Sequence, residues 1–203
     1  MKTRLLLPLF LFASLLPVAA PAQDRAAEAV AALAASFRSR EAYEVDFEVT
    51  AGEFRASGNY AVEGGRYRLT MDDSEVFAEG GIRYVVDRSR REVTIDRADT
   101  TGRNILDDPV HAFDFLNSDY TASLLSEGGG TTVVRLVPAS PAAASSGGIT
   151  LALSTEGLQP RSIAYDFDGD RIEVRIVRIG PLRGAVQAFD AADYPGYEWI
   201  DFR

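Results

Sequence analysis

Apolar and polar residues alternate along most of this 203-residue chain. Residues 43–49 place four apolar side chains on one face and three acidic side chains on the other, which is the pattern of a β-strand with one buried and one solvated face. Similar runs separated by glycine-containing turns predict a continuous antiparallel meander. The further expected strands cover residues 54–62, 66–71, 74–79, 82–87, 91–96, 131–138, 149–154, 160–168 and 170–180.

The stretch "YDFDGDRIEV" (165–174) fits either a calcium loop or a hairpin. A calcium loop of the EF-hand type starting at Asp166 needs glycine at its sixth position and glutamate at its twelfth, where this chain has Arg171 and Val177. Apolar residues alternate on both sides of Asp168-Gly169, and an Asp-Gly pair in that setting is a strong hairpin signal. We therefore expect a hairpin here, not a metal site.

Helical spacing occurs in two places. In the first, Asp24 is a plausible N-cap for an amphipathic helix whose apolar side is formed by Ala26, Ala29, Val30, Leu33 and Phe37. In the second, residues 108–117, Asp107 or Asp108 can cap and Pro109 suits the first helical position. Residues 120–127 fit either a helix or a strand, and the small residues of 138–148 predict a mobile loop.

These elements define the expected fold class, α+β. A large antiparallel sheet must curl or split. We therefore expect a large curved antiparallel sheet forming an incomplete β-barrel (half-barrel), with an N-terminal helix and a short lid helix on one side.

The N-terminus has the order of a secretory signal peptide. Lys2 and Arg4 precede an apolar run, and Ala20-Pro21-Ala22 offers a small-residue cleavage site. The alternative is a membrane anchor, but the apolar run from Leu5 to Leu16 is shorter than the about 20 residues that span a bilayer. We expect residues 1–22 to be cleaved and residues 23–203 to form a single exported domain. Because the chain has no cysteine, it depends on no disulfide and carries no lipid on a cysteine thioether.

The charge of the exported chain limits its partners. Loss of Lys2 and Arg4 lowers the basic residues from 21 to 19 against 30 acidic residues, which gives a formal charge of −11. Such a chain is poorly suited to nucleic acid or to an anionic membrane surface.

Residues typical of catalysis are scarce. His111 is the single histidine and there is no cysteine, so neither a nucleophilic triad nor a zinc site is expected. Carboxylate pairs remain possible for glycoside hydrolysis, but each is equally explained as a turn, cap or hairpin residue: Asp72 with Asp73, Asp107 with Asp108, and the set Asp166, Asp168 and Asp170. We expect a protein that is not an enzyme and that uses no cofactor and no metal.

The order of features resembles the LolA family of periplasmic outer-membrane lipoprotein carriers, especially the LolA-like proteins of Bacteroidota. The resemblance spans nearly all of the exported chain. The segments that carry it are "YEVDFEV" (43–49), "GNYAV" (58–62), "GRYRLTM" (65–71), "IRYVVD" (82–87), "REVTID" (91–96) and "YPGYEWIDFR" (194–203).

The resemblance implies a half-barrel with a hydrophobic cavity for the acyl chains of a lipoprotein in transit through the periplasm. Each buried CH₂ is worth ~0.8 kcal/mol, so long acyl chains need cover in water. The cavity candidates are Phe47, Tyr60, Tyr67, Leu69, Phe77 and Tyr84, and the lid candidates are Phe113, Phe115 and Leu116. Taken singly, each aromatic is equally explained as ordinary core.

The implied partners are acylated lipoproteins, an inner-membrane lipoprotein-releasing ABC transporter and an outer-membrane acceptor of unknown identity. We expect a monomer with no stable membrane insertion. One departure concerns a functional arginine that many family members carry after the strand matching "GNYAV". This chain has Gly64-Gly65 there, and Arg66 and Arg68 are near but do not match, so no arginine role is transferred.

Other functions are also compatible with the sequence. A periplasmic lipid-binding or envelope-stress sensor module could have the same fold. More remote are a carboxylate-based periplasmic hydrolase and an interaction module whose apolar face is filled by its own side chains.

Overall fold

The computed structural model describes residues 22–99, 102–144 and 146–203. The expected signal peptide therefore lies outside the described residues, except for Ala22. In the described part of the chain, no helix is both long and apolar enough to cross a membrane.

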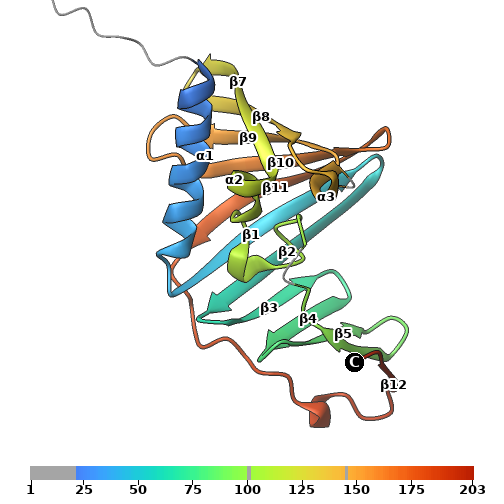
Figure 1. The fold of residues 1–203 in the computed structure, drawn as a ribbon. Coiled ribbons are helices and arrows are strands. Elements are labelled where there is room, and N and C mark those ends of the chain that lie inside the picture. Colours follow the sequence, from blue (N-terminus) through green and yellow to red (C-terminus); the bar gives the residue numbers. More distant parts are fainter. Residues whose placement is uncertain (1–21, 100–101, 145) are drawn as a thin grey trace, which may run out of the picture.

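One curved sheet forms the body of the molecule, and most of its helical segments lie against one face (Figure 1). The elements are α1 (Ala22–Arg38), β1 (Ala42–Ala51), β2 (Phe54–Glu63), β3 (Arg66–Met71), β4 (Ser74–Glu79), β5 (Ile82–Asp87), β6 (Glu92–Arg97), η1 (Pro109–His111), α2 (Phe115–Asp119), β7 (Tyr120–Gly128), β8 (Thr131–Pro138), α3 (Pro141–Ala144), β9 (Gly148–Ser154), β10 (Pro160–Phe167), β11 (Asp170–Gly180), η2 (Ala191–Asp193) and β12 (Glu198–Asp201).

The sheet consists of two meanders joined side by side. Its strand order is β12-β6-β5-β4-β3-β2-β1-β11-β10-β9-β8-β7 over the described residues. Pairing of β1 with β11 joins the meanders, and β12 adds a parallel strand next to β6. The sheet is thus open, with β12 and β7 at its edges. The expected α+β class and incomplete barrel are confirmed.

The Asp-Gly hairpin is also confirmed. Asp168 and Gly169 connect β10 to β11 with φ angles of 50° and 90°, so both central residues have the positive φ of a type I′ turn. Asp166, instead of facing a metal site, accepts hydrogen bonds from Arg135 and Arg171.

Two local predictions need correction, and the open alternative for residues 120–127 is resolved. Helix α1 begins at Ala22, so Asp24 lies in its first turn and not at the N-cap. Residues 120–127 belong to strand β7. The segment expected to be a mobile loop contains the short helix α3, in which Ala143 is fully buried.

Two long connections cross the sheet, one on each face. The chain leaves β6 and returns as β7 at the opposite edge, and the segment between them lies on the same face as α1 (Figure 1). We call this face the inner face and residues 102–119 the lid segment. The second connection runs from β11 to β12 across the outer face, and we call residues 181–203 the strap.

The inner face carries the main core. The five apolar positions expected on the first helix are all buried in it. They pack over the part of the sheet that ends at β7. Strands β8, β9 and β10 contribute fully buried side chains to the same core. An apolar helix side therefore covers an apolar sheet face, as the two sequence patterns require.

The outer face is lined by ion pairs and by a second, aromatic cluster. Arg178 and Arg183 both form ion pairs with Glu44 and Asp46. Arg68 and Arg88 both form ion pairs with Glu75. Backbone N–H groups of the strap donate to sheet carboxylates, from Arg183 to Glu44 and from Val186 to Glu63, each over 3.3 Å.

The strap ends in an aromatic stack. The ring of Phe189 lies parallel to Tyr84 at 4.1 Å and to Tyr194 at 5.5 Å. Phe77, Val86 and Val93 are buried beneath it. This cluster holds the strap against β4, β5 and β6. It thereby positions β12 to pair with β6.

Acid should weaken the outer-face ion pairs. Burial alone would raise the pKa of Glu75, but hydrogen bonds from Arg68 and Arg88 hold it below its usual value. The ionised Glu75 carboxylate contributes fully to folding stability above its unfolded-state pKa, about 4.3. This contribution is lost as the pH falls through the lower folded-state pKa. The unfolding free energy should therefore fall as the pH is lowered from about 4.5 toward 2.

In Glu75→Gln, that fall should be shallower and stability at neutral pH lower, measured by calorimetry between pH 2 and 7. The exposed-turn variant Glu53→Gln is the control and should follow the wild type. An identical pH profile for wild type and Glu75→Gln would contradict the assignment.

Removing the central ring of the aromatic stack should release the strap. We expect Phe189→Ala to lower the unfolding free energy by roughly 2–3 kcal/mol and to make residues 181–203 sensitive to protease. Phe202→Ala is the matched control, because Phe202 is 71% exposed. Urea unfolding and limited proteolysis measure both effects; equal behaviour of the two variants would show that the stack does not hold the strap.

Candidate functional site

The candidate site is the apolar inner face of the sheet together with the lid segment. Residues directly opposite on paired strands point to the same face, so the strand register assigns side chains to faces. Val45 is paired with Tyr60, Tyr60 with Leu69, and Tyr67 with Val62. Four of the expected cavity residues thus share the inner face, namely Phe47, Tyr60, Tyr67 and Leu69, and all are buried.

The other two cavity candidates, Phe77 and Tyr84, lie on the outer face, where they line a separate hollow of about 160 Å³ under the strap. Phe77 is paired with Tyr84 on one side and with Arg68 on the other, and Arg68 lies opposite Ala61 on the outer face. Both rings pack under the strap. The inner positions of these strands are Val76 and Val85 instead.

Phe47 reaches across the inner face because its neighbour lacks a side chain. Gly58 lies directly opposite Phe47, and a Cβ atom at Gly58 would be 2.5 Å from the Phe47 ring. A larger residue at position 58 would displace the ring. Glycine is therefore needed for this close approach.

The lid segment is two short helical pieces, not the single helix expected over 108–117. Asp108 caps η1 by accepting a hydrogen bond from the His111 N–H, and α2 follows after a break. Phe113 and Leu116 are 1% exposed and belong to the core, whereas Phe115 is half-buried against Tyr120. In this state the lid segment fills the space between α1 and the sheet.

Hydroxyl groups of sheet tyrosines fasten the lid segment. Tyr43 donates to the Pro109 carbonyl over 2.7 Å and Tyr67 donates to the Asp107 carbonyl over 3.1 Å. The hydroxyl of Tyr165 accepts from the Ile105 N–H over 3.0 Å. Three separate strands, β1, β3 and β10, thus hold the same segment.

Burial keeps these hydroxyls protonated. It raises the pKa of Tyr67 to about 12, and it raises the pKa values of Tyr43 and Tyr165 further. The attachment of the lid segment therefore does not change with pH in the physiological range.

Beyond the lid segment the inner face is less covered, and it is apolar as far as β5, where the ion pair of Arg83 with Asp96 lies on the same face as Val85. Met71, Val76 and Val85 are half-buried on it, next to Leu69. Where β1, β2, β10 and β11 end, Phe54, Phe167 and Ile172 point to the same face and are 51%, 52% and 39% exposed. These three residues form an apolar rim.

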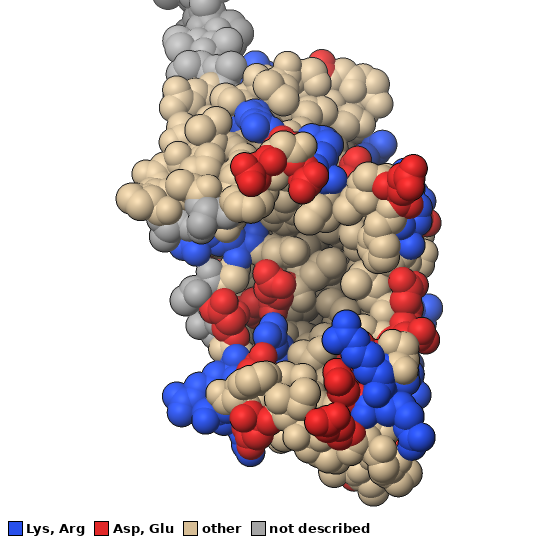
Figure 2. Space-filling model, turned by 90° about the vertical axis from the view of Figure 1, so that its right-hand side faces the viewer, with Lys and Arg blue, Asp and Glu red and all other residues tan. Residues whose placement is uncertain are grey.

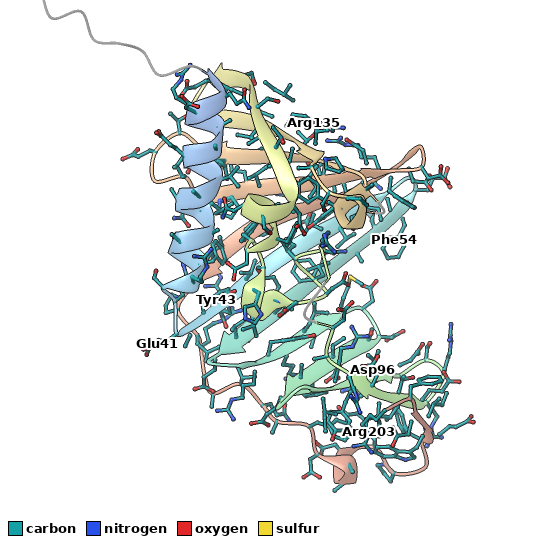
Figure 3. The ribbon with its side chains drawn as sticks, in the orientation of Figure 1. Glu41, Tyr43, Phe54, Asp96, Arg135 and Arg203 are labelled. Carbon is teal, nitrogen blue, oxygen red and sulfur yellow. The ribbon has the colours of Figure 1, made fainter. Side chains whose placement is uncertain are left out.

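The molecule is hollowed on the side of this rim. Phe54 lies at the right in Figure 3, opposite the side where Tyr43 and α1 lie. Figure 2 looks from the right and shows a recess with an uncharged floor and charges of both signs around it. A further hollow of about 180 Å³ separates the lid segment from β3 and β4 and is lined by Tyr67, Ala78, Val110, Asp107, Asp108 and His111.

The polar groups near the lid segment make capping and charge contacts. His111 Nδ1 lies 2.9 Å from Asp108 Oδ2, within the capping contact of η1. Burial raises the pKa of Asp107, and the nearby charges of Asp99 and Asp108 add to this while Arg83 opposes it. In the described residues no group of three metal-ligating side chains is placed to hold an ion.

The two arginines near the family position also lie on the outer face. Arg66 contacts Glu63 and Glu79, and Arg68 contacts Glu75. Neither side chain points to the apolar inner face.

Sequence reasoning missed several residues of this site. Ile105 is fully buried, but it stands in a short loop with no periodic pattern to reveal it. The roles of Tyr43 and Tyr165 depend on carbonyl and N–H groups that are 60 or more positions away in the chain. Alternation placed Phe167 on a strand face but gave no sign of its exposure.

The fold and site define a class: an α+β protein with an open sheet whose apolar inner face is covered by a helix and a tethered lid. No family model matches the sequence, and no curated protein matches it. Solved structures are similar to it at low sequence identity, so the likeness concerns the fold.

An uncharacterized conserved protein from Thermus thermophilus has a TM-score of 0.54 and 7% identity, over 88% of this chain and 99% of that chain. A chain of the Pseudomonas aeruginosa MucA/MucB complex has a TM-score of 0.48 and 18% identity over 81% of this chain. The present chain spans 59% of that chain's length.

A third similar structure is the LolA superfamily protein NE2245 from Nitrosomonas europaea, with a TM-score of 0.40 and 10% identity, over 83% of this chain and 96% of that chain. The structural neighbours include a protein described as a member of the LolA superfamily. They do not bear on the narrower expectation of a Bacteroidota-type member.

Loosening one tether should make the lid segment more mobile. Tyr43→Phe leaves the Pro109 carbonyl without its donor, so we expect a loss of about 1–3 kcal/mol in unfolding free energy and faster amide exchange in residues 102–119. Hydrogen–deuterium exchange with mass spectrometry measures the second effect. Tyr197→Phe, on the strap, is the control. Unchanged exchange in the lid segment of Tyr43→Phe would show that this tether does not restrain it.

Proposed function

We propose that this protein is a periplasmic carrier that binds the acyl chains of lipoproteins against its inner face and delivers them toward the outer membrane. The proposal includes no catalytic step. It includes export by a cleaved signal peptide, loading from an inner-membrane lipoprotein-releasing transporter and release to an outer-membrane acceptor. The sequence resemblance to the LolA family supports these finer points.

The continuity of the apolar inner face carries the proposal. Its closed part is filled by the lid segment, and the open part continues through Met71, Val76 and Val85 toward the rim of Phe54, Phe167 and Ile172. An apolar surface that is only partly covered is typical of a site that binds lipid, another ligand or protein. An acyl chain that lies along it can extend inward when the lid segment moves out.

The energetics favour such an exchange of occupants. At ~0.8 kcal/mol per buried CH₂, a chain of about 16 carbons brings roughly 12 kcal/mol of apolar burial. That gain can replace the packing of Phe113, Leu116 and Ile105, which are buried on the same face. The lid segment and the ligand then compete for one surface, and release requires only that the lid segment returns or that the acceptor binds more tightly.

The first experiment is native mass spectrometry of the protein purified, without detergent, from the periplasm of a host that makes lipoproteins. We expect a complex with acylated lipoprotein at a simple ratio. Val85→Asp places a charge on the open inner face and should abolish the complex, because a buried carboxylate is costly beside an acyl chain. Val177→Asp, at a position 53% exposed, is the matched control and should keep it.

Thermal unfolding of both variants confirms that they are folded. Recovery of free phospholipid or fatty acid alone would contradict the carrier role and favour a lipid-binding sensor module. A bare protein mass, repeated after incubation with an acylated peptide, would refute acyl binding altogether.

A further inference from the structure

Among the described residues, two buried tyrosine hydroxyls of the inner face lack a hydrogen-bond partner, those of Tyr60 and Tyr120, and Tyr60 is the more deeply buried of the two. Tyr60 is 0% exposed, and its hydroxyl oxygen has no hydrogen-bond partner. A buried polar group in this state costs stability compared with the same ring without the hydroxyl. A phenylalanine would fill nearly the same volume without that cost.

The surroundings of Tyr60 make the missing partner notable. Its ring lies 6.2 Å from that of Tyr43 and 6.0 Å from that of Phe47, centroid to centroid. The hydroxyls of Tyr43 and Tyr165 lie close enough to that of Tyr60 to influence its pKa. Both of them form hydrogen bonds with the lid segment. Tyr60 is thus the member of this buried tyrosine group that the lid segment does not use.

The hydroxyl keeps its proton and is available as a donor. Burial raises the pKa of Tyr60 well above its usual value, so the group stays protonated. The groups around it within the inner face are otherwise apolar, apart from the other tyrosines. A ligand entering here would meet an apolar surface with one available O–H donor.

We propose that the Tyr60 hydroxyl donates a hydrogen bond to the carbonyl oxygen of an acyl ligand that replaces the lid segment. This deepens the proposed function and rests on it, since it assumes that the ligand occupies the inner face. It selects apolar chains that carry a carbonyl, such as esters, thioesters and amides of fatty acids, over plain hydrocarbon chains. The carbonyl needs a donor because it leaves water on binding.

The test compares ligands with and without the carbonyl. One peptide carries an S-palmitoyl cysteine and a second, of the same sequence, carries S-hexadecyl cysteine, which has no carbonyl; palmitic acid is the third probe. Isothermal titration calorimetry gives the affinities for wild type and Tyr60→Phe. We expect Tyr60→Phe to bind the palmitoyl peptide about tenfold more weakly and the hexadecyl peptide as well as wild type does.

The palmitic acid arm identifies the source of the carbonyl. Tighter binding of the palmitoyl peptide than of palmitic acid by wild type supports an acylated protein as the ligand, and the reverse order supports a free fatty acid. In either case the Tyr60→Phe change must weaken binding of the preferred probe, or the assignment is overturned.

Thermal unfolding without ligand is the second readout. If the hydroxyl is unsatisfied in the closed state, Tyr60→Phe should unfold at the same temperature as wild type or higher, whereas Tyr43→Phe, which loses a real partner, should unfold at a lower one. A clear fall for Tyr60→Phe would overturn the inference, because the hydroxyl would then be bonded in the free protein.

The two proposals fail differently. If wild type binds none of the three probes, the proposed function is wrong and the role of Tyr60 falls with it. If wild type binds the palmitoyl peptide and Tyr60→Phe binds it equally well, acyl binding stands and only the Tyr60 assignment is refuted.

Discussion

The need to cover one apolar face of a wide sheet governs most of this structure. Two meanders joined at β1 and β11 present a continuous inner face of aliphatic and aromatic side chains. A single helix of 17 residues covers only part of it. The remainder is covered by the β6–β7 connection, which must cross the inner face because the two strands stand far apart in the strand order. Topology thus places a short, irregular segment where a regular helix would bind more firmly.

That arrangement gives the lid segment two opposed properties. Ile105, Phe113 and Leu116 of this segment are as deeply buried as any residue in the core, and tyrosine hydroxyls from three strands hold its backbone. Yet its regular structure is limited to η1 and the five residues of α2, so few internal hydrogen bonds would be lost if it moved. Segments of this kind open at a lower free energy than the sheet that carries them.

Much of the sheet could be predicted from alternation, because strands such as residues 43–49 have one clearly apolar and one clearly charged face. The Asp168-Gly169 turn and the apolar side of α1 could also be predicted from the sequence pattern. Alternation failed at residues 74–79 and 82–87, where Val76 precedes Phe77 and Tyr84 precedes Val85. Both faces of these strands carry apolar residues, so alternation alone does not predict which face of the sheet the aromatic side chains occupy. The answer depends on the strap, which arrives from more than 100 positions further along the chain.

The same long-range dependence separates the two faces in function. Phe77 and Tyr84 pack against the ring of Phe189 in the strap, and a hollow of about 160 Å³ remains between these residues and the strap. The inner face is completed by a segment that is tethered through single hydroxyl groups, while the hydroxyl of Tyr60 between those tethers is left without a partner. A core selected only for stability has no reason to retain that hydroxyl, since phenylalanine would remove its cost. Under the proposed function, this hydroxyl gains a partner when an acyl ligand replaces the lid segment.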